Sequence, residues 1–339
     1  MTLYIDIYGI QIEVYTQNTS LFSMIQKYYA PFLVDAIEKP DVYINLERYG
    51  YVSRKKHFVL DSDFATFGSA VQIDTNNKRY FFSQQEMSGT LDFSDPDIIK
   101  VHGKLIPNKI RHWVNIALQG FTRIDKYYNR FIIKTCIHDI VFILLEQKLS
   151  SCLLHATAVT NGEKTYLFTG LGGSGKSTLA SSFLQKKGFT ILSDNYGIVA
   201  GNKIFPFPEL PRITKGTQKL LGMDLKNKAD GTKNYLENNT DSLQKSYQID
   251  GIFVCSYGKE FELSVIEDTA YIFELLSSIN NYTKEFPEYL NLSLLSVIGK
   301  FNTNEQRIKN LKNIIDNNRF YLLKNNKDID NTLNSILNV

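Results

Sequence analysis

The first hundred residues alternate between apolar and polar positions. Residues 2–15 place apolar side chains at every second position on either side of Gly9, and a period of two is typical of strands. A helix is expected over Leu21 to Tyr29, capped by Thr19 or Ser20 and ended before Pro31. Further strand-like runs cover 42–46, 58–60, 70–73 and 80–82. The pattern predicts a smaller β-rich α+β domain over 1–105, and no chemical motif in it indicates a role.

After Pro107 the apolar spacing becomes helical and basic residues accompany it: Lys109, Arg111, Arg123, Lys126 and Arg130. We expect an amphipathic helix that breaks near Gly120. Its basic side is either a solvated face or a surface for an acidic or phosphate-bearing partner. A second helix begins at Phe131, and 106–150 is predicted to be a helical connector packed on the core.

The apolar run from Phe131 to Leu149 is interrupted by five titratable residues: Lys134, His138, Asp139, Glu146 and Lys148. A membrane span needs about 20 mostly uncharged residues, so we expect a buried core helix and no membrane association. The first residues also lack the basic and apolar regions of a signal peptide. These observations favour a cytoplasmic protein.

Buried strands are predicted on both sides of an Asn161-Gly162 turn, at Cys152–Thr160 and Thr165–Thr169. A helix then covers 177–187 and ends at Gly188. The following strand, 189–192, leads to Asp194. Strand, glycine-rich loop, helix and strand form the βαβ unit that a phosphate-binding loop requires, and 151–339 is predicted to be the α/β domain that contains it.

The glycine-rich loop between strand and helix matches the G-x-x-x-x-G-K-[ST] motif. A chance match in a chain this long has odds on the order of one in a hundred. Its glycines would let consecutive N–H groups converge on phosphate oxygens, next to the positive end of the helix. Lys176 would reach the β- and γ-phosphates, and the Ser177 hydroxyl would ligate Mg²⁺. The predicted nucleotide-binding residues are Gly170, Gly172, Gly173, Ser174, Gly175, Lys176, Ser177 and Thr178.

Two further residues are candidates for the same site. Asp194 ends the next strand, where a carboxylate could serve as a second Mg²⁺ ligand; alternatively it caps a turn with Asn195 and Gly197. His155 lies on the strand antiparallel to the one that feeds the loop. Taken alone, a histidine in an apolar strand is usually a core residue.

Composition and charge set limits on the class of protein. The chain has 339 residues, and 43% hydrophobic and 13% aromatic content exclude a largely disordered chain. A net charge of +3 gives no global case for nucleic acid binding. The alternative of an ATPase coupled to nucleic acid is supported only by the basic helix over 109–130. Three dispersed cysteines, Cys136, Cys152 and Cys255, favour buried reduced thiols over a metal site.

Several segments together resemble the catalytic domain of HPr kinase/phosphorylase. They are Leu154-His155-Ala156, the run from Tyr166 to Ser177, Leu192-Ser193-Asp194-Asn195, and Phe205 to Arg212. The likeness is closer to the HPr-kinase-related proteins of bacterial peptide-modification clusters, including lasso peptide precursor kinases. It covers 130–215 well, 250–339 loosely and the first 105 residues not at all. In the loosely covered part, strands are expected at Ile252–Cys255, Leu263–Ile266 and Tyr321–Leu323.

The resemblance implies a phosphoenolpyruvate-carboxykinase-like P-loop fold and a kinase that uses ATP and Mg²⁺ to phosphorylate a serine hydroxyl of a peptide or protein. Lys176 and Ser177 match the family's phosphate and Mg²⁺ positions, Asp194 the first aspartate of a pair, and His155 a catalytic-site histidine. The main departure is Asn195, which stands where the second aspartate acts as general base. An amide cannot accept that proton.

Three outcomes follow from this departure. Either Asp194 serves both as Mg²⁺ ligand and as base, or His155 takes the proton, or catalysis is lost and a nucleotide-binding regulatory or scaffold protein remains. Arg212 is the candidate cation for the transferred phosphoryl group, with a surface arginine as the alternative. Residues 214–234 are expected to form a basic loop that either closes over the substrate or is solvated. Phosphorylase activity is not expected, and a homo-oligomer is left open.

Overall fold

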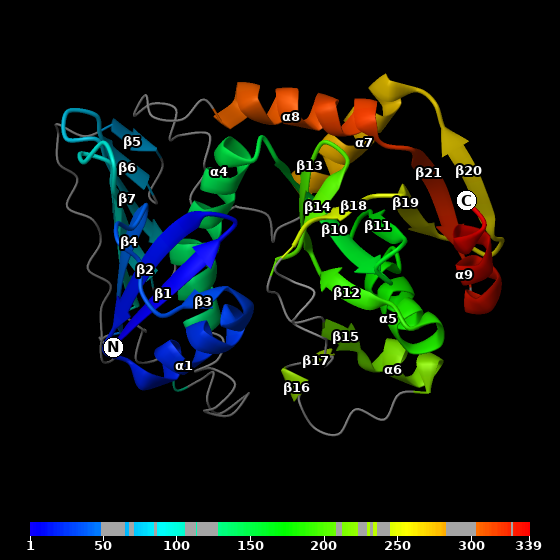
Figure 1. The fold of residues 1–339 in the computed structure, drawn as a ribbon, viewed down its shortest axis with the longest axis horizontal. Helices are drawn as coiled ribbons and strands as arrows, with labels where there is room; N and C mark the ends of the chain where they lie inside the picture. The colour runs from blue at the N-terminus through cyan, green and yellow to red at the C-terminus, as the bar shows by residue number, and fades with distance from the viewer. Residues whose placement is uncertain are drawn as a thin grey trace. The chain divides into compact units, whose positions relative to one another are not determined.

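The computed structural model describes residues 1–48, 65–67, 71–84, 87–105, 113, 128–207, 212–222, 229–230, 233–235, 245–282, 303–326 and 328–339. The protein is mixed α/β, with two large mixed sheets (Figure 1). It divides into two compact units. The first contains Met1–Leu145 and Pro287–Asn304, and the second contains Glu146–Phe286 and Glu305–Val339. The domain boundaries expected near residues 105 and 150 stay a prediction.

The first unit is built on a sheet with strand order β3-β1-β2-β4-β9-β8-β7-β6-β5. Its strands are β1 (Thr2–Ile7), β2 (Ile10–Thr16), β3 (Leu33–Val34), β4 (Val42–Arg48), β5 (Ala65–Phe67), β6 (Val71–Asp74), β7 (Arg79–Gln84), β8 (Met87–Asp92) and β9 (Ile99–Leu105). Alternate side chains of β1, β2 and β4 are buried, which confirms the predicted period of two. The expected runs at 42–46 and 80–82 fall within β4 and β7, and that at 70–73 overlaps β6. The 58–60 run lies outside the described residues.

The first helix differs from its prediction at the cap. Helix α1 (Thr19–Tyr28) is capped by Asn18, whose Oδ1 accepts a hydrogen bond from the N–H of Leu21 at 2.9 Å. Neither Thr19 nor Ser20 is the cap, because both already lie inside the helix. A short 3-10 helix, η1 (Ala30–Phe32), contains Pro31 and follows directly.

The predicted core helix is confirmed by burial. Residues 128–133 are helical and continue through a π-helical turn, η2 (Lys134–His138), into α4 (Asp139–Lys148). Gly103 allows the close approach of η2 to the sheet, because a Cβ at that position would lie 2.5 Å from Cys136 Sγ. Most of the basic helix expected over 109–130 lies outside the described residues. Among the helices that the structure describes, none is long and apolar enough to cross a membrane.

The second unit has a central sheet with strand order β18-β14-β13-β10-β11-β19-β21-β20, and β12 also pairs with β10. Its strands are β10 (Cys152–Thr160), β11 (Thr165–Thr169), β12 (Thr190–Ser193), β13 (Tyr196–Ala200), β14 (Lys203–Phe205), β18 (Tyr247–Gln248), β19 (Gly251–Tyr257), β20 (Glu262–Ile266) and β21 (Phe320–Asn325). Strands β10 and β11 have the predicted bounds. Strands β19, β20 and β21 contain the three later predictions, whereas the strand expected at 189–192 runs from 190 to 193.

Helices cover both faces of this sheet (Figure 1). They are α5 (Lys176–Lys187), α7 (Thr269–Tyr282), α8 (Thr303–Asn317) and α9 (Ile329–Leu337). One core cluster joins α5 and α9 to Val159, Phe168 and Phe253. The other joins α7 and α8 to Leu154, Ala156 and Leu167. Successive residues of β10 therefore face opposite layers, and the odd-numbered positions 155–159 face the α5 side.

A small sheet of strand order β15-β17-β16 stands apart from the central one. It comprises β15 (Arg212–Thr214), β16 (Ala229–Asp230) and β17 (Lys233–Tyr235), and helix α6 (Lys215–Leu221) follows β15. The expectation that 214–234 is a loop is therefore wrong in part. Its first residues form a helix, which buries the apolar Leu221 and the hydrogen-bonded Thr217.

Candidate functional site

The glycine-rich loop joins the end of β11 to the first turn of α5, as predicted. Three of its glycines adopt positive φ angles: Gly170 (146°), Gly173 (85°) and Gly175 (95°). Residues with a Cβ rarely take this conformation. A Cβ on Gly170 would also lie only 2.6 Å from the carbonyl oxygen of Cys255. Gly172 differs from the prediction, because its φ is not positive and a Cβ there would meet nothing within 4 Å.

Lys176 lies across its own loop. The side chain is only 6% exposed, and its ammonium Nζ donates to the carbonyl oxygens of Gly170 at 2.7 Å and Leu171 at 3.1 Å. The positive charge therefore lies against the loop backbone, and the predicted contact of Lys176 with the β- and γ-phosphates stays a prediction. Burial also raises the pKa of the neighbouring Cys255 thiol to about 12, although the positive charge of Lys176 opposes this rise. All three cysteines are free and buried, as expected.

The two predicted Mg²⁺ ligands are in contact. Ser177 Oγ donates to Asp194 Oδ1 at 3.1 Å, and Thr157 Oγ1 donates to the same oxygen at 2.9 Å. Asp194 is 3% exposed and Thr157 is 1% exposed. Asp194 and Asn195 form the bend between β12 and β13, whereas Gly197 lies inside β13 and pairs with Leu154. The choice between an Mg²⁺ ligand and a turn residue at Asp194 stays a prediction.

The strand register explains this contact. Ser193 is opposite Ala158 and Tyr196 is opposite His155, so Asp194 is opposite Thr157. Between β12 and β13, Asn195 takes a φ of 78°, and its carbonyl accepts a hydrogen bond from the N–H of Ala156 at 3.3 Å. Asparagine tolerates this left-handed conformation better than most residues, and such outliers cluster at functional sites.

His155 is buried beside this group. It lies two residues before Thr157 on β10, so both side chains project from the same face of the sheet. Its backbone N–H donates to Asn280 Oδ1 at 3.0 Å, and its carbonyl accepts from Thr169 Oγ1 at 3.0 Å. The structure thus brings His155, Asp194, Asn195 and the loop together, and whether the imidazole takes part in chemistry stays a prediction.

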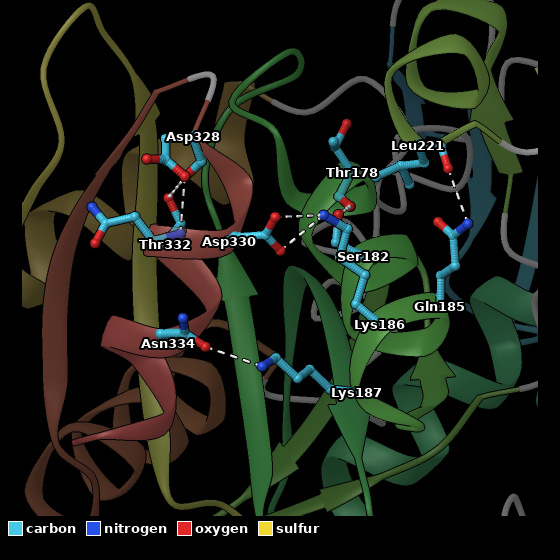
Figure 2. A network of polar contacts seen from close by, with 11 residues as sticks. Thr178, Ser182, Gln185, Lys186, Lys187, Leu221, Asp328, Asp330, Thr332 and Asn334 are labelled. Atoms are coloured by element: carbon cyan, nitrogen blue, oxygen red, sulfur yellow. Dashed lines mark hydrogen bonds and ion pairs between the residues drawn. The ribbon is translucent and has the colours of Figure 1, made fainter.

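Two other predicted residues are placed differently. Arg212 begins β15, outside the central sheet, and only its backbone is described, so its role stays a prediction. The Thr178 hydroxyl forms a 3.0 Å hydrogen bond with the Thr217 hydroxyl of α6. On the next turn of α5, Ser182 Oγ donates to the Thr178 carbonyl at 2.7 Å (Figure 2). Thr178 therefore ties α5 to α6.

Three residues outside the predicted set organise the site. Thr157 bonds Asp194, Asn280 of α7 bonds the backbone of His155, and Asn325 at the end of β21 bonds the loop carbonyl of Ser174 at 3.3 Å. Nothing near Thr157 or Asn280 in the sequence marks them. Asn325 follows a predicted strand, and polar residues at strand ends line ligand sites in α/β sheets, which is a usable signal.

The chemistry of the donors suits a phosphate chain with Mg²⁺. Mg²⁺ prefers hard oxygen ligands and is usually bound through one or two carboxylates together with substrate phosphates and water. Asp194 and Ser177 provide such oxygens at the N-terminus of α5. The described residues contain no group of three or more His, Cys, Asp and Glu that could hold a metal.

No protein-family model matches this chain, and a search of the curated proteins finds no matching sequence. Fold and site together define a mixed α/β protein whose second unit carries a glycine-rich strand–loop–helix next to a buried carboxylate. The resemblance to HPr kinases rests on the motif residues alone.

Proposed function

We propose that the protein is an ATP- and Mg²⁺-dependent kinase that transfers the γ-phosphate to a serine hydroxyl of a peptide or protein. The observation that carries this proposal is the 3.1 Å hydrogen bond between Ser177 and Asp194. It brings the hydroxyl of the glycine-rich loop and the strand-end carboxylate to one point, where oxygen ligands for Mg²⁺ beside a phosphate chain are needed.

Each residue has a distinct role in this proposal. The N–H groups of the loop and the N-terminus of α5 bind the phosphates, and Lys176 exchanges its carbonyl partners for phosphate oxygens. Ser177 and Asp194 hold Mg²⁺, which neutralises charge on the β- and γ-phosphates when it is bound. Catalysis then depends mainly on positioning and electrostatic stabilisation.

The transfer step makes one bond and breaks one. The serine oxygen bonds the γ-phosphorus while the bond from that phosphorus to the β,γ-bridging oxygen breaks, and ADP leaves. The hydroxyl proton needs an acceptor. Asp194 and His155 are the candidates, since the Asn195 amide has no basic lone pair to offer. A loose transition state makes a weak base sufficient.

The direct test uses the full chain, Mg²⁺, ATP labelled at the γ-position and serine-containing peptides encoded by genes next to its own. We expect phosphoserine with the wild-type protein and none with Lys176→Ala or Asp194→Asn. Two matched controls should retain activity: Lys186→Ala on the same helix, and Asp330→Asn in an exposed ion pair with Lys186. Tight ATP binding without transfer to any peptide would contradict the proposal.

A second candidate is a nucleotide-binding regulatory or scaffold protein in which ATP only sets the conformation. The buried amide of Asn195, where a base is expected, favours it. The variant Asn195→Asp separates the two, because aspartate also tolerates the left-handed backbone. A kinase should gain transfer rate from the added carboxylate, whereas a scaffold should show no turnover with either residue and should lose a partner interaction in Lys176→Ala.

A further inference from the structure

Asn325 lies at the same edge of the central sheet as the glycine-rich loop. Strand β21 runs parallel to β19, and β19 runs parallel to β11, so the carboxyl ends of all three strands meet there. Asn325 is the last residue of β21 and is 5% exposed. Its carbonyl accepts a hydrogen bond from the N–H of Gly258 at 2.8 Å, which fixes its backbone.

The side chain of Asn325 holds one peptide group of the loop. Its Nδ2 donates to the carbonyl of Ser174 at 3.3 Å. That carbonyl and the N–H of Gly175 belong to the same planar trans peptide, so they point in opposite directions. A donor that fixes the carbonyl therefore also fixes the direction of the Gly175 N–H, on the side away from Asn325. The fit is close, because a Cβ on Gly175 would lie 3.3 Å from Asn325 Nδ2.

The orientation of this amide follows from its chemistry. Reversing it would place Oδ1 against the Ser174 carbonyl, and two acceptors cannot form a hydrogen bond. In the observed orientation Asn325 Oδ1 is buried and has no hydrogen-bond partner among the described residues, and the same holds for Ser174 Oγ. A buried amide oxygen without a partner is destabilising. The contribution of Asn325 to the loop therefore comes from its donor.

We propose that Asn325 is a positioning residue for phosphate binding: it holds the Ser174 carbonyl and thereby aims the Gly175 N–H at the phosphate chain of the nucleotide. The inference rests on the nucleotide-binding part of the proposed function and is independent of phosphate transfer to serine.

The segment that carries Asn325 also holds the far end of α5. Lys186 Nζ donates to the two carboxylate oxygens of Asp330 at 2.8 and 3.0 Å, and Lys187 Nζ donates to Asn334 Oδ1 at 3.0 Å (Figure 2). Asn334 is exposed and contacts the helix rather than the loop. Asn334 is therefore a matched control, because it is an asparagine of the same segment that also forms a hydrogen bond with α5.

The Ser174–Gly175 peptide can be observed by itself. The sequence contains two Ser-Gly pairs, Ser88-Gly89 and Ser174-Gly175. Labelling the serine carbonyl carbon and the glycine nitrogen of the full chain therefore gives two signals in a carbonyl-filtered NMR spectrum. Inorganic tripolyphosphate with Mg²⁺ is the probe, because it has phosphates but no base or sugar.

In the wild type we expect the Ser174–Gly175 signal to shift on titration and the Ser88–Gly89 signal to stay. In Asn325→Ala the first signal should move before any probe is added, and tripolyphosphate should bind about tenfold more weakly, the effect of one charge-assisted hydrogen bond. Asn334→Ala should match the wild type. If the alanine variant does not fold, Asn325→Asp takes its place, because aspartate keeps the shape of the side chain without the donor. Asn325→Asp should then bind tripolyphosphate at least about tenfold more weakly than the wild type.

Unchanged tripolyphosphate affinity in Asn325→Ala would overturn the inference, as would an equal loss in Asn334→Ala or a shift of the Ser88–Gly89 signal. No binding by the wild type would overturn it together with nucleotide binding. A wild type that binds tripolyphosphate but phosphorylates no serine would refute the kinase proposal and leave Asn325 supported.

Discussion

Replacing Thr157 by valine removes one hydroxyl from the site and keeps the shape of the side chain. Thr157 and Asp194 are both buried and form a 2.9 Å hydrogen bond at Oδ1, which also accepts a hydrogen bond from Ser177. The variant therefore leaves a buried carboxylate with one donor fewer. Hydrogen bonds to charged groups are worth about 1.5–3 kcal/mol.

This loss should appear in Mg²⁺ binding. Partners that orient a metal ligand typically contribute about 10- to 100-fold to metal affinity. We expect Thr157→Val to raise the Mg²⁺ concentration needed for half-maximal ATP binding by about tenfold, or about 1.4 kcal/mol. The assay is a calorimetric ATP titration at a series of Mg²⁺ concentrations.

Thr160→Val is the matched control on the same strand. The Thr160 hydroxyl bonds the Lys164 carbonyl and the Thr165 hydroxyl at the hairpin end of β10, so its loss should lower stability without changing the Mg²⁺ requirement. If Thr157→Val binds ATP with the wild-type Mg²⁺ dependence, or if Thr160→Val shifts it equally, the positioning of Asp194 by Thr157 is refuted.

Three further predictions concern other parts of the molecule. Gly170→Ala should abolish ATP binding and lower the melting temperature, since left-handed strain costs about 1–3 kcal/mol and the Cβ would meet Cys255; Gly172→Ala should melt like the wild type, and equal effects would contradict the loop geometry. Asn195→Asp should raise the rate of phosphate transfer several-fold in a single-turnover assay. An unchanged rate would show that the missing carboxylate at position 195 does not limit proton removal from the serine hydroxyl. Burial lowers the pKa of His138 to about 3, so the unfolded chain gains a proton first as the pH falls below about 6.5, and His138 should reduce the free energy of unfolding by roughly 2 kcal/mol between about pH 7 and pH 5. Urea unfolding of His138→Phe should lack this fall, and an identical fall would contradict a neutral buried imidazole.

The strands and helices that periodicity predicted were those with a strong local signal. β10 and β11 have the predicted bounds because each is a short apolar run beside a clear turn or glycine loop. The cap of α1 was misplaced because Asn18, Thr19 and Ser20 are all good capping residues, and only the backbone geometry selects one of them.

The loop of the candidate site could be read from the sequence, but the residues that hold it could not. Thr157, Asn280 and Asn325 come from three elements far apart in the chain, and strand register and packing bring them to the site. For Gly172 the prediction went too far, because a glycine in a phosphate-binding motif need not have a positive φ. Such distinctions depend on backbone angles that the residue type alone does not fix.

Detection of phosphoserine after incubation of the full chain with Mg²⁺, ATP and serine peptides from its gene neighbourhood decides whether the protein is a serine kinase. We predict phosphoserine on at least one peptide with the wild-type protein and none with Lys176→Ala. Tight Mg²⁺-dependent ATP binding by the wild type with no phosphoserine on any peptide would contradict the proposed kinase activity.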